Sequence, residues 1–225
     1  MKVLVTGANG YIGRHVVSAL LERGAEVIAS DLNCEGMDER VTIAEAPIFS
    51  GDEDIYEQLG KPDALVHLAW RNGFNHYHDS HITDLPGHYL FLKHMIEGGL
   101  KNLTVMSSAH EVGYFEGAIK PDSETHPVTP YGVGKNALRE LVFPMAKKND
   151  VNLKWLRAYY ILGDDLKNQS VFTKILQAAQ EGRKTFPFTS GKNKFDFISV
   201  QELAAQIAAS SVQDEITGVI NCCTG

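Results

Sequence analysis

The sequence predicts a doubly wound α/β fold, in which helices cover both faces of a parallel sheet. Short apolar segments of strand character alternate with segments of helical periodicity along most of the chain. A glycine-rich turn joins the first of these strands to the first helix. Small or polar residues directly follow several strands, at the edge where open parallel sheets bind ligands.

The first strand and helix flank three glycines with the spacing G-x-x-G-x-x-G. A strand is expected at residues 2–6 (KVLVT), and the helix that follows should end near Gly24. Gly7 can make the tight turn, Gly10 leaves the backbone open to a pyrophosphate, and Gly13 lets the helix approach the strand. The helix N-terminus adds free N–H groups and a partial positive charge. This pattern predicts a dinucleotide site; the alternative is a glycine-rich turn in some other α/β protein.

Composition and charge exclude several other classes of protein. The chain has 225 residues and a net charge of −7, which argues against a nucleic-acid partner. No apolar run approaches the roughly 18 residues of a membrane span, and a strand at residue 2 leaves no room for a signal peptide. Three cysteines, Cys34, Cys222 and Cys223, do not form a disulfide framework. We therefore expect a cytoplasmic protein without a membrane partner.

The second strand, residues 26–30, ends directly before Asp31. A carboxylate at this position can accept hydrogen bonds from the adenosine ribose hydroxyls and would repel a 2′-phosphate, so we expect NAD rather than NADP. Alternatively, Asp31 only begins the next turn. Asp52 could bind the adenine amine or cap a short helix at residues 55–59.

The middle of the chain should supply two more strand ends to the same edge. A strand within residues 41–49 is interrupted by Pro47, and the strand at 64–68 leads to Ala69, whose small side chain would let the cofactor lie against the backbone. The stretch from residue 70 to 88 contains four histidines without metal-ligand spacing, so we expect a loop beside the substrate cleft and no metal. A helix (86–97) and a strand (103–107) follow.

Tyr131 and Lys135 are four residues apart on a helix expected at 129–148, with Pro144 kinking or ending it. Positions i and i+4 share a helix face, so the ammonium should lower the phenol's pKa by about 1–3 units. The phenol could then shuttle a proton near neutral pH, and Ser108 could donate a hydrogen bond to the same substrate oxygen. The alternative is an ordinary pair of residues on a helix surface.

The last quarter of the chain changes character after Gly163. Following a strand at 152–158, the pattern predicts two helices (171–181 and 200–211) and two strands (195–198 and 219–221). We expect a dinucleotide-binding domain at residues 1–162 and, at 163–225, a partial substrate-binding lobe interleaved with the sheet.

These motifs resemble the extended short-chain dehydrogenase/reductases, the NAD-dependent epimerase/dehydratase family, over almost the whole chain. The resemblance rests on TGANGYIG at 6–13, Asp31, His67-Leu68-Ala69, Ser107-Ser108, Tyr131 with Lys135, and Arg157. It implies a Rossmann-type fold and a nucleotide-sugar substrate, with Tyr131 as acid/base, Lys135 on the ribose and Ser108 on the substrate oxygen. The NAD-binding residues that we expect are Gly7, Asn9, Gly10, Tyr11, Ile12, Gly13, Asp31, Asp52, Leu68, Ala69, Ser107, Tyr131 and Lys135.

The sequence departs from the family pattern at its substrate positions. Ala109-His110 stands where 4,6-dehydratases carry an acidic pair, which disfavours dehydration. Tyr160 replaces a substrate-binding Asn, and Phe195 replaces a diphosphate-binding Arg that Lys194 or Lys192 could substitute only as a point charge. The expected substrate residues are Arg71, His110, Tyr160 and Lys194. Family members usually extend further, so the chain resembles a truncated or naturally short member.

We therefore expect an NAD-dependent epimerase or dehydrogenase that acts on a hydroxyl or ketone of a sugar or nucleotide sugar. The alternative is a non-catalytic NAD-binding regulatory or interaction module, which the departures at the substrate positions would favour. A homodimer through the Tyr131 helix is also expected, because this helix has a broad apolar surface made of Ala137, Leu138, Leu141 and Val142; the alternative is that this surface is buried entirely within the core of one chain.

Overall fold

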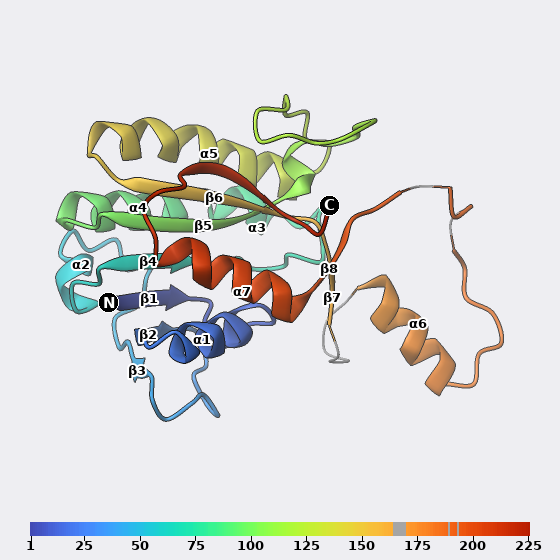
Figure 1. Ribbon diagram of the computed structural model, residues 1–225, viewed down its shortest axis with the longest axis horizontal. Coiled ribbons are helices and arrows are strands. Elements are labelled where there is room, and N and C mark those ends of the chain that lie inside the picture. Colours follow the sequence, from blue (N-terminus) through green and yellow to red (C-terminus); the bar gives the residue numbers. More distant parts are fainter. Residues whose placement is uncertain (164–169, 189, 193) are drawn as a thin grey trace.

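A computed structural model describes residues 1–163, 170–188, 190–192 and 194–225. Within them, a seven-stranded sheet has the order β3-β2-β1-β4-β5-β6-β9, and each neighbouring pair is parallel (Figure 1). Its strands are β1 (Lys2–Thr6), β2 (Glu26–Ser30), β3 (Thr42–Ile43), β4 (Ala64–His67), β5 (Asn102–Ser108), β6 (Asn152–Ala158) and β9 (Gly218–Cys222). The predicted doubly wound fold is confirmed.

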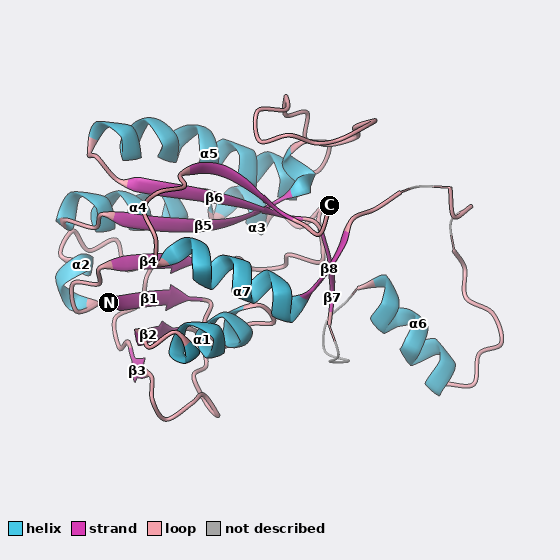
Figure 2. Cartoon of the chain, in the orientation of Figure 1, coloured by secondary structure: helices cyan, strands magenta, loops and turns pink. Residues whose placement is uncertain are grey.

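Helices cover both faces of this sheet (Figure 2). The first core layer contains α1 (Gly13–Glu22) and α7 (Val200–Ser211), which pack against each other and against β1, β4, β5 and β6. The second contains α2 (Ile55–Gln58), α4 (Leu85–Gly98) and α5 (Pro130–Lys148), with the short α3 (Ser80–Thr83) against α5. Because both faces are covered, the central strands β1, β2, β4, β5 and β6 are almost continuously buried, as their apolar sequences require, whereas the edge strand β3 is exposed.

Side-chain caps define where several helices begin. The Thr129 hydroxyl accepts a hydrogen bond from the backbone N–H of Gly132, and Pro130 takes the first helical position of α5. At α7, Ser199 and Glu202 form a reciprocal capping box. Pro144 does not end α5, which continues to Lys148; a kink at Pro144 remains a prediction.

The C-terminal segment is shared between the main sheet and a smaller unit. There, β7 (Tyr160–Leu162) pairs with β8 (Phe197–Ser199), and α6 (Val171–Gln180) lies beyond them, away from the large sheet (Figure 1). The strand β9 instead extends the main sheet by pairing with β6, and α7 packs on the same sheet against β4, β5 and β6. A separate boundary at residue 163 remains a prediction.

Some local expectations differ from the structure. The strand predicted within 41–49 is reduced to the two residues of β3, which ends four residues before Pro47. Of the apolar residues expected to face a second subunit, Leu138 and Val142 are fully buried in the core of this chain, while Leu141 is exposed. A homodimer remains a prediction. None of the described helices is both long and apolar enough to cross a membrane.

Two buried histidines connect β1, β4 and α4. His67 Nδ1 is hydrogen-bonded to the Thr6 hydroxyl at 2.8 Å, and His67 Nε2 to His88 Nδ1 at 2.9 Å. Burial lowers the pKa of His67, and it lowers the pKa of His88 to about 3, with the charge of Lys135 adding to both effects. Both rings are therefore neutral in the folded protein at any pH near neutrality.

This pair predicts a loss of stability in mild acid. Below a pH of about 6.5 each histidine gains a proton in the unfolded chain but not in the folded one, so the free energy of unfolding should fall by about 1.4 kcal/mol per pH unit for each. In urea titrations between pH 7 and pH 4, His88→Phe should reduce this slope. Replacing the exposed His126 by Gln is the control, and an equal slope in parent and His88→Phe would contradict the prediction.

Candidate active site

The glycine turn between β1 and α1 lies at the carboxyl edge of the sheet, against the segment that follows β4. Gly7 has a φ of 68°, and a Cβ there would lie 2.8 Å from the backbone nitrogen of Ala69. A Cβ on Gly13 would lie 2.0 Å from the Gly7 carbonyl oxygen. Both positions therefore require glycine, which the sequence pattern predicted from the close approach of helix and strand.

The open backbone at Gly10 and the start of α1 fit a pyrophosphate. A Cβ on Gly10 would have one close neighbour, the Gly7 oxygen at 3.1 Å, so the rest of that space is open. The N-cap residue of α1, Ile12, makes no side-chain cap hydrogen bond. The N–H groups of Arg14 and His15 already donate to the carbonyls of Gly10 and Ile12, at 3.2 and 3.1 Å. The open backbone at Gly10 and the helix dipole are therefore what this turn offers to an anion.

Asp31 lies at the end of β2, beside this turn. One carboxylate oxygen accepts a hydrogen bond from the backbone N–H of Asn9 at 2.8 Å, and the other accepts from the N–H of Leu32 at 2.7 Å. These bonds fix the carboxylate and leave lone pairs for two more donors. The open turn and the N-terminus of α1 fit the pyrophosphate of NAD, and the fixed Asp31 carboxylate fits its ribose.

The other residues expected at the cofactor surround the same turn, with different tasks. The Asn9 amide donates to the carbonyls of Asn33 and Glu35 and so holds the loop after β2. Tyr11 reaches across to Gly163, where a Cβ would collide with its hydroxyl. Ile12 is the N-cap residue of α1 and packs into the core, as does Leu68.

Asp52 lies just before α2, and its side chain is exposed. Its backbone carbonyl accepts a hydrogen bond from His94 Nδ1 on α4 at 3.0 Å. The expected contact of Asp52 with the adenine amine remains a prediction.

Ser108, Tyr131 and Lys135 lie together at the ends of β5 and α5. Ser108 is the last residue of β5, and its hydroxyl interacts with the Tyr131 phenol. Lys135 is one turn further along α5, buried, and its Nζ donates a hydrogen bond to the Met106 carbonyl at 2.8 Å. The carboxyl end of β5 and the first turns of α5 thus bring a hydroxyl, a phenol and an amine to the same edge of the sheet as the glycine turn.

The electrostatics of this group differ from the expectation. Burial raises the pKa of Tyr131 to about 12; the interaction with Ser108 lowers it and the charge of Glu111 raises it further. Burial also lowers the pKa of Lys135 to about 7, against a raising effect of Glu111. The expected lowering of the Tyr131 pKa was wrong for the protein itself, because desolvation of the phenol outweighs the effect of a lysine directed at Met106.

Ser107, expected at the cofactor, instead binds a buried carboxylate. Its hydroxyl donates to Glu111, which lies in the short 3₁₀ helix η1 (Ala109–Glu111). Glu111 also accepts from Trp155 Nε1 at 2.7 Å and from Arg157 Nε at 3.0 Å, both on β6. Sequence reasoning missed Glu111; the signal for it was Arg157, a charged residue within a strand of otherwise buried type.

Aromatic rings from the segment between β4 and α4 surround Tyr131. The His76 ring is stacked on the phenol at 5.1 Å between centroids, and His81 approaches it edge-on at the same distance. His110 contacts both His76 and Tyr131, and burial lowers its pKa to about 4. The expected loop is therefore an enclosing wall, and His110, predicted to bind substrate, lies next to the phenol. Within the described residues no cluster of three His, Cys, Asp or Glu side chains could hold a metal ion.

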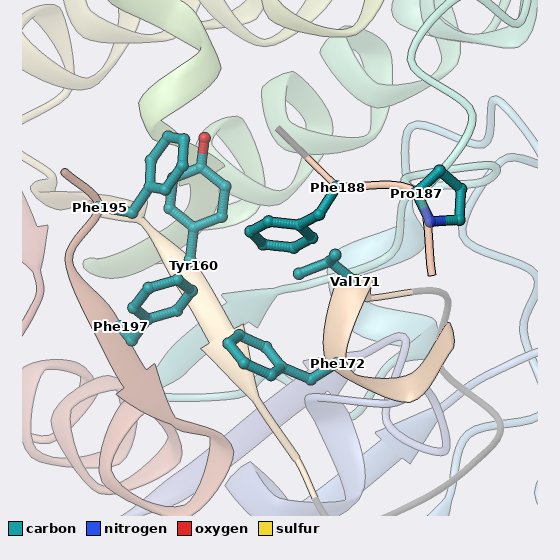
Figure 3. A pocket seen from close by; sticks show the side chains of 7 residues that line it. All are labelled: Tyr160, Val171, Phe172, Pro187, Phe188, Phe195 and Phe197. Atoms are coloured by element: carbon teal, nitrogen blue, oxygen red, sulfur yellow. The ribbon is translucent and has the colours of Figure 1, made fainter. Parts of the chain in front are cut away.

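The remaining expected substrate residues lie further out. Arg71 makes a bidentate ion pair with Asp84 on the surface, with Nη2 2.7 Å from Oδ1 and Nε 2.8 Å from Oδ2. Lys194 is exposed on the extended segment before β8. Tyr160 lines an apolar pocket of about 440 Å³ between β7, β8 and α6 (Figure 3). The other lining residues are Val171, Phe172, Pro187, Phe188, Phe195 and Phe197.

Comparison with known proteins identifies the family. The model of the NAD dependent epimerase/dehydratase family matches residues 3–223. The chain is 43% identical to the dTDP-6-deoxy-L-talose 4-dehydrogenase (NAD(+)) of Aggregatibacter actinomycetemcomitans, over 100% of this chain and 85% of that protein.

Solved structures agree on the fold. MoeE5 in complex with UDP-glucuronic acid and NAD has a TM-score of 0.84 at 23% identity, covering 100% of this chain and 77% of the other. UDP-glucose 4-epimerase of Thermotoga maritima has a TM-score of 0.81, also at 23% identity, covering 98% and 76%. With the family match, the expected fold, cofactor and class of enzyme are confirmed, and the chain belongs to the NAD dependent epimerase/dehydratase family.

Proposed function

We propose that the protein is an NAD-dependent dehydrogenase that oxidises a ring hydroxyl of a nucleotide-linked deoxy sugar. The observation that carries this proposal is the placement of Ser108, Tyr131 and Lys135 beside the glycine turn and Asp31. The full-length similarity to a dTDP-6-deoxy-L-talose 4-dehydrogenase supports dehydrogenation and this substrate class. Ala109 and His110 support it further, since they leave no acidic pair to expel a hydroxyl.

The proposed roles follow from where each side chain lies. Without substrate, the interaction of Ser108 with Tyr131 lowers the pKa of that phenol. When substrate is bound, the single Ser108 hydroxyl proton is donated to the substrate oxygen instead. Tyr131 removes the proton of the substrate hydroxyl and holds it on its phenolic oxygen. When bound, NAD⁺ supplies the hydride acceptor and a positive ring charge. Lys135 binds the ribose and adds its own positive charge, one helical turn from the phenol.

The substrate side differs from a site that grips a diphosphate with arginine. Tyr160 and Phe195 lie 4.3 Å apart between ring centroids and contribute to the apolar pocket, and Arg71 is paired with Asp84. We propose that Lys194, exposed next to Phe195, is the cation that meets the diphosphate, as a point charge without a planar fork.

A product assay separates dehydrogenase, epimerase and non-catalytic module. The protein is mixed with NAD⁺ and a panel of dTDP- and UDP-sugars, while nicotinamide absorbance and sugar products are both followed. Net reduction of NAD⁺ with a keto-sugar product is the expected result. A 4-epimer formed without net reduction of NAD⁺ would indicate that the protein is an epimerase. Binding of NAD without any sugar product would indicate a non-catalytic NAD-binding module.

Asp31 should determine the choice of cofactor. Because its carboxylate can accept from both ribose hydroxyls and would repel a 2′-phosphate, NAD should bind at least tenfold more tightly than NADP. Asp31→Ala should weaken NAD binding and narrow this gap, which calorimetry or fluorescence titration measures. Equal affinities for the two cofactors in the parent protein would refute this role of Asp31.

Removing the Tyr131 hydroxyl should abolish most of the chemistry without unfolding the protein. Tyr131→Phe keeps the ring within its wall of histidines, so NAD affinity and thermal stability should change little, while single-turnover oxidation should slow by about 10²–10⁴. Tyr114→Phe, at an exposed tyrosine, is the matched control and should react at the parent rate. If Tyr131→Phe kept the parent rate, the residue would be structural.

A further inference from the structure

Lys135 is a buried amine with an unusual set of neighbours. Its side chain is only 4% exposed, and among the described residues no carboxylate forms an ion pair with it. One partner of Nζ is the Met106 carbonyl; the other is the face of the Trp70 indole, whose centroid lies 3.8 Å away. A cation at this distance over an indole is attracted by the negative face of the ring, most strongly where water is excluded.

The orientation of the Trp70 indole is fixed by a hydrogen bond at its edge and a stacked ring on its face. Its Nε1–H donates to His81 Nδ1 at 3.0 Å, so the His81 Nε2–H must donate to the Asn75 carbonyl, 2.8 Å away. One face of the indole stacks with His88, with ring centroids 4.5 Å apart and planes 21° apart. The indole therefore has little freedom to turn away from Lys135.

The helix that carries Lys135 is shaped to meet this ring. A Cβ on Gly134 would lie 2.3 Å from the His81 carbonyl and 3.4 Å from Trp70 Cζ2. Only glycine at 134 lets α5 approach the Trp70–His81 pair this closely. The contact between Lys135 and Trp70 is thus built from three segments: the end of β4, α3 and α5.

We propose that Trp70 is a positioning residue for Lys135: its indole face holds the ammonium group at the base of the site, in place of a carboxylate. This role rests on the proposed function of Lys135. A carboxylate at this position would cancel the positive charge that the phenolate and the ribose require, whereas an aromatic face stabilises the ammonium and leaves its net charge intact.

The other ionisable groups around Lys135 do not replace this contact. His67 on β4 and His88 on α4 have pKa values that burial lowers, so both rings are neutral and add no charge. Tyr131, on α5 itself, has a raised pKa and is neutral. Glu111 in η1 raises the pKa of Lys135, but it is already bound to Ser107, Trp155 and Arg157.

The test measures the ionisation of Lys135 in the protein without added ligand. Protein labelled with carbon-13 in its lysine side chains is titrated by NMR, and Lys135→Met assigns the resonance. The parent should titrate near 7. Trp70→Leu, which removes the ring face, should lower the Lys135 pKa by about 0.5–1.5 units, and Trp70→Phe and Trp70→Tyr should give intermediate values. NAD affinity should fall in the same order.

The controls keep this proposal separate from the proposed function. Phe74→Leu removes an exposed ring from the same loop and should leave the Lys135 titration unchanged. If Trp70→Leu fails to fold, the order of parent, Trp70→Tyr and Trp70→Phe decides the question. An unchanged or higher Lys135 pKa across these variants would overturn the proposal, making Trp70 a packing residue. The titration needs no substrate, so an inactive protein would refute the function without touching this result.

Discussion

The buried carboxylate of Glu111 holds together the elements that carry the proposed catalytic side chains. It accepts hydrogen bonds from Ser107 at the end of β5 and from Trp155 and Arg157 on β6, and Arg139 on α5 lies 3.8 Å away. Each donor partly offsets the cost of removing the carboxylate from water. Removing one partner of such a buried pair generally costs about 3–5 kcal/mol, because the other charge is left without compensation.

The hydrogen bonds of Glu111 fix the geometry at the carboxyl end of β5. Ser108 follows Ser107 directly: the Ser107 hydroxyl is bound to Glu111, while the Ser108 hydroxyl, at the last residue of β5, interacts with Tyr131. Arg157 also donates to the carbonyls of Lys120 and Pro121, which ties the long loop before α5 to the same carboxylate. The buried Glu111 carboxylate thus orients the end of β5, the loop and α5. Its negative charge contributes an upward shift to the pKa of both Tyr131 and Lys135, although desolvation makes the overall shift of Lys135 downward.

On the other side of the catalytic group, the protein uses neutral rings instead of charges. Trp70, His81 and His88 stack beneath Lys135, while His76 and His110 enclose Tyr131. Such rings exclude water from the phenol and the amine without introducing anions that would neutralise Lys135. The pocket beside β7 and β8, which we propose to be on the substrate side, is also apolar, since five aromatic side chains line it (Figure 3).

The sequence alone determined the succession of strands and helices except for the short α3 and β7, together with the glycine turn and the set Ser108, Tyr131 and Lys135. These features are local: a turn without Cβ atoms, a carboxylate at a strand end and an i, i+4 pair are each readable within a few residues. Only the tertiary structure decided which partners these residues meet. Ser107 and Ser108 are adjacent, yet one binds Glu111 and the other faces Tyr131. Lys135 meets Trp70, which lies 65 positions earlier in the sequence. Such contacts depend on how distant segments pack and on desolvation, and neither is encoded in local spacing.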